Sequence, residues 1–140
     1  GMFLSSLRQL QDVDPGFRSE GVLTGHVSLS GASYHDNDAK KANFIESVTA
    51  RMSQQPGVIA SAAVYPLPFG NMGNPSGSFS IEERPSAPND PGPHSDKRWA
   101  TPGYLSAVQI PLLRGRWFTD GDRANTQPVA VIDDVLARAY

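Results

Sequence analysis

The residues with catalytic or metal-binding chemistry are scattered along this sequence and form no motif. The three histidines, His26, His35 and His94, are far apart, and neither HExxH nor another close ligand pair occurs. No serine lies in a Gly-x-Ser-x-Gly or Ser-x-x-Lys sequence, the patterns typical of activated serine nucleophiles. The absence of cysteine excludes thiolate nucleophiles and cysteine-based zinc sites. We therefore predict no catalytic residue and no bound metal.

One glycine-rich stretch and two acidic pairs are the other candidates. Residues 70–77 lack the Lys-Ser/Thr of a phosphate-binding loop and precede a predicted strand, not a helix N-terminus. Asp120 and Asp122 lack the alternating oxygen ligands of a calcium loop, so we interpret them as turn residues. Asp133 and Asp134 are placed to complement the dipole of a following helix. The sequence therefore predicts no cofactor site.

The elements that would position any site begin with a helix over residues 38–55. Asn37 or Asp38 can cap it, and the Pro56-Gly57 pair stops it. Strands are predicted on both sides, over residues 22–29 and 58–65, which makes one strand–helix–strand unit. Parallel pairing of these strands would require a right-handed crossover. The helix should pack on the sheet through apolar positions at helical spacing, which are Ala42, Ile45, Val48 and Met52, with Phe44 beside them.

Shorter elements follow in the second half. Strands are predicted over residues 77–82, 96–100, 112–118 and 128–132, and helices over residues 103–108 and from residue 133 to the end. Residues 85–95 contain four prolines and should not pack. The fold class is therefore α+β, with a mixed sheet, strand–helix–strand passes and helices packed on one face. The aromatic group of Trp99, Tyr104, Trp117 and Phe118 is interpreted as core, with a small-molecule pocket as the alternative.

Length and composition describe one globular unit. The chain has 140 residues, 39% of them hydrophobic, and a formal net charge of -2. Because no Lys/Arg cluster occurs that could neutralise a run of phosphates, nucleic acid is not an expected partner. Neither an apolar run of about 18 residues nor a signal peptide is visible. Gly1 before Met2 resembles the remnant of a cleaved tag, and the last predicted helix stops at Tyr140, so we expect an excised fragment.

Several segments, in this order, are similar to the periplasmic core domain of MacB-like permeases, particularly the acidobacterial-type branch. They are residues 7–17 (LRQLQDVDPGF) with 21–24 (GVLT), residues 55–58 (QPGV) with 62–68 (AAVYPLP), residues 80–82 (SIE), residues 101–105 (TPGYL), residues 110–118 (IPLLRGRWF), and residues 128–132 (PVAVI) with 136–138 (LAR). The ordered set covers nearly the whole chain. One departure is the Asp133-Asp134 pair, where the family commonly has Asn-Glu.

This resemblance implies a non-catalytic extracytoplasmic domain of an ABC transporter permease of the FtsX/MacB type. Residues 1–17 would be a juxtamembrane segment after a missing first membrane helix, and residues 18–140 the N-terminal part of a MacB-like periplasmic core domain. The implied location is the periplasmic side of a bacterial inner membrane. The implied partners are the permease membrane helices, the cytoplasmic ATPase and a periplasmic adaptor or substrate. ATP hydrolysis would drive substrate export or force transmission through this domain.

Residues 66–76 form a turn-rich loop suited to contact such a partner, with Phe69, Asn71, Met72 and Asn74 as the candidate contact residues. The alternative function is a stand-alone extracytoplasmic ligand-binding domain or hydrolase that uses the aromatic group and a histidine. Apolar positions in residues 4–13 and 135–140 also predict that this chain associates with itself.

Overall fold

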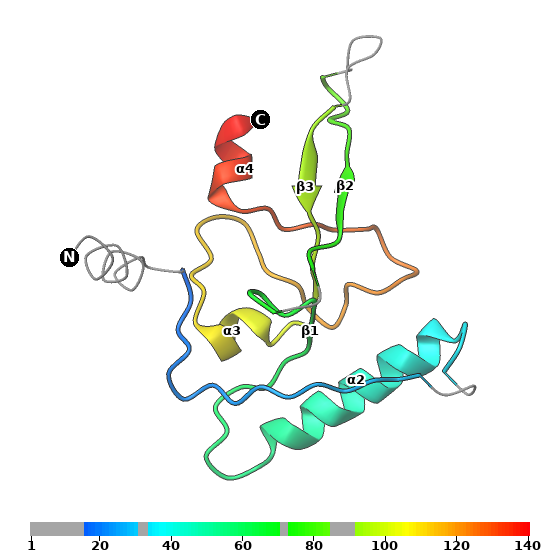
Figure 1. The fold of residues 1–140 in the computed structure, drawn as a ribbon, viewed down its shortest axis with the longest axis vertical. Helices are drawn as coiled ribbons and strands as arrows, with labels where there is room; N and C mark the ends of the chain where they lie inside the picture. Colours follow the sequence, from blue (N-terminus) through cyan, green and yellow to red (C-terminus); the bar gives the residue numbers. More distant parts are fainter. Residues whose placement is uncertain (1–15, 31–33, 71–72, 85–91) are drawn as a thin grey trace, which may run out of the picture.

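The computed structural model describes residues 16–30, 34–70, 73–84 and 92–140 (Figure 1). In these parts the protein is a mixed α/β structure with few helices and two small antiparallel sheets. The α+β class predicted from the sequence is confirmed at this level. Most of the predicted juxtamembrane segment, residues 1–15, lies outside the described residues.

Helix α2 (Asp38–Ser53) begins and ends close to the positions that the sequence predicts. Asn37 is its N-cap, because its Oδ1 accepts a hydrogen bond of 2.9 Å from the Lys40 amide. The chain leaves the helix at Gln54 and turns at Gly57, whose φ of 83° is readily adopted by glycine. Ile45 and Val48 are half-buried as expected, whereas Met52 is 54% exposed. The predicted apolar stripe is therefore only partly covered.

The central sheet pairs strand β1 (Val64–Tyr65) with strand β4 (Trp99–Ala100) in antiparallel register. The predicted strand–helix–strand unit is wrong, because residues 22–29 form no strand and β1 pairs with the second half of the chain. The Thr101 hydroxyl accepts a hydrogen bond of 2.9 Å from the Ala63 amide, and the Thr101 amide donates one of 3.0 Å to the Ala63 carbonyl. This pair of contacts between Thr101 and Ala63 extends the two-residue ladder and fixes its register.

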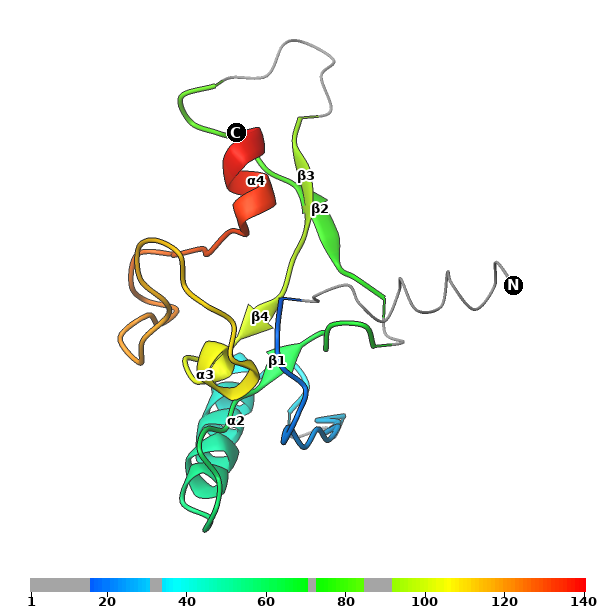
Figure 2. The same cartoon turned by 90° about the vertical axis from the view of Figure 1, so that its left-hand side faces the viewer.

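The second sheet is a ribbon of strands β2 (Ser76–Ser78) and β3 (His94–Asp96), also antiparallel. Figures 1 and 2 show this ribbon extending away from α2. The strand predicted over residues 77–82 is shorter than expected, since Ile81 already faces Arg84 in an isolated bridge that closes a turn. The strand predicted over residues 96–100 is divided between β3 and β4.

Two short helices, α3 (Tyr104–Val108) and α4 (Asp134–Ala139), confirm the two helices predicted in the second half. The Asp133 side chain caps α4 by accepting a hydrogen bond of 2.7 Å from the Leu136 amide, and Asp134 lies in the first turn. The strands predicted over residues 112–118 and 128–132 are wrong. Both stretches are described by the structure and contain no paired strand, so they contribute nothing to a mixed sheet.

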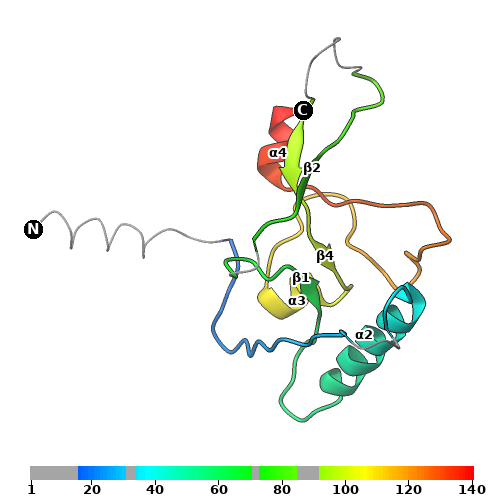
Figure 3. The same ribbon diagram turned by 45° about the vertical axis from the view of Figure 1, so that its right-hand side comes forward.

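The described residues do not enclose an apolar core. Among them only Pro66 is fully buried, while Leu23 and Ile59 are 98% and 99% exposed. Figure 3 shows long irregular segments between the elements, which do not stack as layers of sheet and helix. The expectation of a compact unit with helices packed on one face of a sheet is therefore not met in this part of the chain.

Candidate functional site

The predicted contact loop begins at the buried Pro66 and turns sharply at Phe69. The Gly70 amide donates a hydrogen bond of 3.0 Å to the Leu67 carbonyl, which closes the turn. Phe69 has a φ of 58°, an uncommon conformation for a residue with a side chain. Its ring is 84% exposed and lies 5.8 Å from the ring of Phe17, measured between centroids. The turn therefore presents one aromatic side chain at the surface.

The structure describes one of the other three candidate contact residues. Asn71 and Met72 lie outside the described residues. Asn74 is described, and its Oδ1 accepts a hydrogen bond of 3.0 Å from an Arg98 guanidinium nitrogen. A second contact, from the Lys97 amide to the Pro75 carbonyl at 2.7 Å, joins the same two stretches. The end of the loop is thus attached to the β3–β4 connection, and its role in binding a partner stays a prediction.

A hollow of about 250 Å³ lies beside this loop. The first described segment, the loop and α3 all contribute to its wall, through Phe17, Arg18, Ser19, Val22, Thr24, Leu67, Pro68, Tyr104 and Val108. A backbone hydrogen bond of 2.9 Å from the Arg18 amide to the Val108 carbonyl joins the first segment to α3. The wall is mostly apolar, but the volume lies below the range of about 300–1,000 Å³ that is usual for small-ligand sites, and no histidine or carboxylate is among these nine residues.

Tyr104 is the residue lining the hollow whose pKa is shifted by its surroundings. Burial raises the pKa of its phenol, and the positive charge of Arg98 opposes this effect more weakly. A phenol is protonated at neutral pH already at its ordinary pKa, so Tyr104 can serve as a hydrogen-bond donor at the wall of the hollow. This chemistry suits the orientation of a bound molecule and provides no general base.

The structure does not bring the three histidines together. His26 is exposed on the segment before α2, and the His35 Nδ1 lies 2.8 Å from an Asp36 carboxylate oxygen at the surface. His94 lies opposite Ser78 in the β2–β3 ribbon, with 3.4 Å between its Nδ1 and the serine Oγ. That distance exceeds the usual contact between an activated serine and its base, and the pair is exposed. In the described ranges no group of three or more potential metal ligands occurs.

The four aromatic residues predicted to share a core separate into different contacts. Trp99 is 59% exposed and lies 6.0 Å from Tyr65, whereas Trp117 lies 4.4 Å from Phe118, each between ring centroids. Tyr104 alone lines the hollow. The core interpretation is wrong for Trp99, because the antiparallel pairing of β1 and β4 places it against Tyr65 at the surface.

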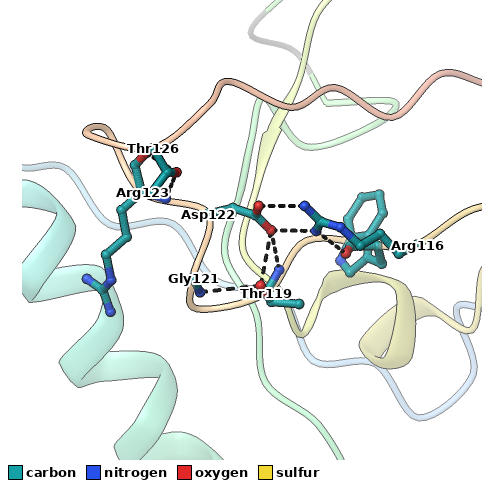
Figure 4. Close-up of polar contacts among 7 residues, drawn as sticks. Arg116, Thr119, Gly121, Asp122, Arg123 and Thr126 are labelled. Carbon is teal, nitrogen blue, oxygen red and sulfur yellow. Dashed lines mark hydrogen bonds and ion pairs between the residues drawn. The ribbon is translucent and has the colours of Figure 1, made fainter.

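A polar turn at residues 116–122 is the most fully connected cluster in the described structure (Figure 4). Both oxygens of Asp122 accept hydrogen bonds from the Arg116 guanidinium, at 2.7 and 2.8 Å. The Thr119 amide and hydroxyl donate to the same carboxylate at 2.8 and 3.2 Å. These contacts, first of all those from Arg116, hold the pKa of Asp122 well below its usual range. The turn interpretation of Asp122 is confirmed, since its oxygens are already engaged by the protein.

Sequence reasoning missed two contacts around the hollow and the loop. One is the contact between Thr101 and Ala63, because in the sequence the Thr101-Pro102 pair marks only the start of the helix predicted over residues 103–108. The other is the contact between Phe17 and Phe69, residues more than fifty positions apart. Neither involves a residue pattern that predicts its partner, because both depend on how distant segments meet.

Comparisons with known proteins find no match for this chain. No protein-family model matches the chain, and neither the curated proteins nor the solved structures provide a match. Within the described residues, none of the helices combines the length and the apolar character needed to cross a membrane.

Proposed function

We propose that this chain is a non-catalytic extracytoplasmic domain of an ABC transporter permease, similar to the periplasmic core of MacB-like permeases. In this role it links cytoplasmic ATP hydrolysis to substrate export or force transmission. The ordered set of MacB-like segments, from residues 7–17 to residues 136–138, carries the proposal. No single segment does so, because each is short.

The placement of these segments agrees with the proposal. Residues 101–105 attach α3 to β1 through Thr101, and Gly103 packs directly against the Ser61 carbonyl oxygen. Residues 62–68 lead from β1 into the loop that presents Phe69. Two of the segments that carry the resemblance, residues 62–68 and 101–105, thus meet beside α3. A domain that transmits movement needs such a connected point between its parts and a surface for its partner.

The coding sequence that contains this chain is the first test. The proposal expects an apolar segment of about 20 residues encoded just before residue 4, and an ATPase domain in the same gene or its neighbour. A coding sequence with neither feature would reject the proposal.

A functional test uses the complete permease in lipid nanodiscs with its ATPase. Phe69→Ala should reduce substrate-stimulated or adaptor-stimulated ATP hydrolysis and leave basal hydrolysis unchanged, because the loop contacts a partner and not the nucleotide. Leu113→Ala is the matched control, since Leu113 is 68% exposed and lies outside the loop. Equal effects of the two substitutions would show that Phe69 is not a specific contact residue.

The hollow beside the loop favours a second candidate, a stand-alone ligand-binding domain. Its mostly apolar wall and the protonated Tyr104 suit a small, largely apolar molecule with one hydrogen-bond acceptor. A screen of such compounds by saturation-transfer NMR tests this function. Binding that Tyr104→Phe weakens and Phe69→Ala leaves intact would favour it over the transporter role.

A further inference from the structure

The segment between the first turn and α2 is an unpaired length of backbone. The Val22 amide donates to the Ser19 carbonyl at 3.2 Å, and after that contact residues 23–30 make no backbone hydrogen bond in the described structure. They contain no helix and no turn (Figures 1 and 3). The sequence of this segment nevertheless has the alternation of a strand. It therefore offers a row of free amides and carbonyls to another extended chain.

One end of this segment is anchored and the rest is mostly open. Val22 is half-buried and lines the hollow beside α3 together with the exposed Thr24, so the start of the segment lies against the rest of the protein. On the opposite face Leu23 is 98% exposed and Val27 is 56% exposed, while Leu29 is half-buried. Since the segment is held at one end, a second strand could add to it without ordering it from a random coil.

The sequence of the segment is complementary to itself about His26. If a second copy lies antiparallel with the two His26 residues facing each other, Leu23 faces Leu29, Thr24 faces Ser28, and Gly25 faces Val27. Leu23 and Leu29 are both aliphatic, and Thr24 and Ser28 both carry a hydroxyl, while Gly25 leaves room beside Val27. At the ends of the pairing Val22 faces Ser30. Residues 21–30 contain no lysine, arginine, aspartate or glutamate, so no like charges oppose the pairing.

We propose that two copies of this protein associate by antiparallel pairing of residues 22–30, with a two-fold axis at His26. Such an interface uses the same surface patch on both copies, as two-fold symmetric dimers do. The free backbone specifies an extended strand as the occupant, and the symmetry of the side chains about His26 specifies a second copy. This surface adjoins the contact loop, because Val22 and Thr24 line the same hollow as Leu67 and Pro68. The proposal nevertheless rests on the backbone of residues 22–30 and does not depend on the transporter role.

Cysteine cross-linking tests the register, since the natural chain has no cysteine. In His26→Cys the two thiols would face each other across the axis, within the Cα separation of about 4.4–6.8 Å that disulfides need. Mild oxidation should therefore produce a covalent dimer. Thr24→Cys is the matched control, because its thiol would lie about four residues, roughly 13 Å, from the same thiol in the second copy. The double variant Thr24→Cys with Ser28→Cys should regain the cross-link.

Analytical ultracentrifugation measures the association without a chemical cross-link. Leu23→Ser removes two Leu23–Leu29 contacts per dimer and should raise the dissociation constant by about twofold to thirtyfold. Circular dichroism confirms that each variant keeps its helices, and these positions are largely exposed. A protein that stays monomeric at about 100 µM, or equal cross-linking of the His26→Cys and Thr24→Cys variants, would overturn the proposal. Association unaffected by Leu23→Ser would do the same.

Discussion

Gly103 occupies a position where even a methyl group does not fit. A Cβ built on Gly103 would overlap the backbone carbonyl oxygen of Ser61 and reach the Ala62 side chain at 3.7 Å. Because the obstructing atom belongs to the backbone, it cannot rotate away as a flexible side chain would. Gly103 itself has a φ of -73°, so alanine would meet no conformational penalty there. The steric overlap is therefore the main effect of Gly103→Ala.

Two opposing terms determine the result of Gly103→Ala. Overpacking against fixed neighbours typically costs about 1–3 kcal/mol. Replacing glycine by alanine where the backbone allows it stabilises by about 0.4–1 kcal/mol, because the unfolded chain loses freedom. The net expectation is a loss of about 1–2 kcal/mol in the free energy of unfolding. With a urea dependence of about 2 kcal/mol per molar, the unfolding midpoint should fall by about 0.5–1 M.

Urea titration followed by circular dichroism at 222 nm measures this midpoint. Gly25→Ala, measured at a concentration at which the chain is monomeric, is the matched control, because a Cβ at Gly25 would meet no atom within 4 Å of the same chain and the φ of Gly25 is not positive. That variant should be as stable as the natural protein or slightly more stable. If Gly103→Ala unfolded at the natural midpoint, the close approach of α3 to Ser61 would not exist in solution. If both variants lost stability equally, a general intolerance of alanine would explain the result instead.

Three further predictions concern single polar contacts. Thr101→Val should lower the free energy of unfolding by about 1–3 kcal/mol and accelerate hydrogen exchange at the Ala63 amide, which loses its acceptor, whereas Thr101→Ser should preserve both. Asn37→Ala should lower the free energy of unfolding by about 1 kcal/mol and reduce the circular dichroism of α2, and a fully retained signal and midpoint would contradict the cap. The folded state holds the pKa of Asp122 below its unfolded value, so its contribution to stability is complete above about pH 5 and is lost as the pH falls below about 4. Thermal unfolding between pH 7 and pH 2 should therefore show a smaller decline for Asp122→Asn than for the natural protein, and identical pH profiles would refute the role of that carboxylate.

The helices could be predicted from the sequence because their signals are local. A cap at Asn37 and a stop at Pro56-Gly57 define α2 within a few residues, and Asp133 does the same for the start of α4. These contacts join residues three or four positions apart. No distant segment has to be known for them to form.

The strands were mostly mispredicted because strand propensity does not choose a partner. Residues 22–29 have a strand-like sequence but no paired strand among the described residues, and strand formation requires hydrogen bonds to another chain segment. The pairing of Val64 with Ala100 joins residues that no alternation pattern connects. The exposed position of Phe69 likewise depends on a tight turn and on the distant Phe17. The sequence indicates a turn-rich loop and includes Phe69 among four candidate contact residues, but it does not indicate how exposed Phe69 is.

The two tryptophans lie in environments that a fluorimeter can separate. The Trp117 indole nitrogen is buried without a hydrogen-bond partner in the described structure, and its ring lies against Phe118. Trp99 is more than half exposed. Emission from Trp117 should therefore lie at shorter wavelength, and a water-soluble quencher such as iodide should reach Trp99 first. Each indole then reports on its own region, so the opening of the β1–β4 sheet and the loosening of the 116–122 turn can be followed as separate optical events in one unlabelled molecule.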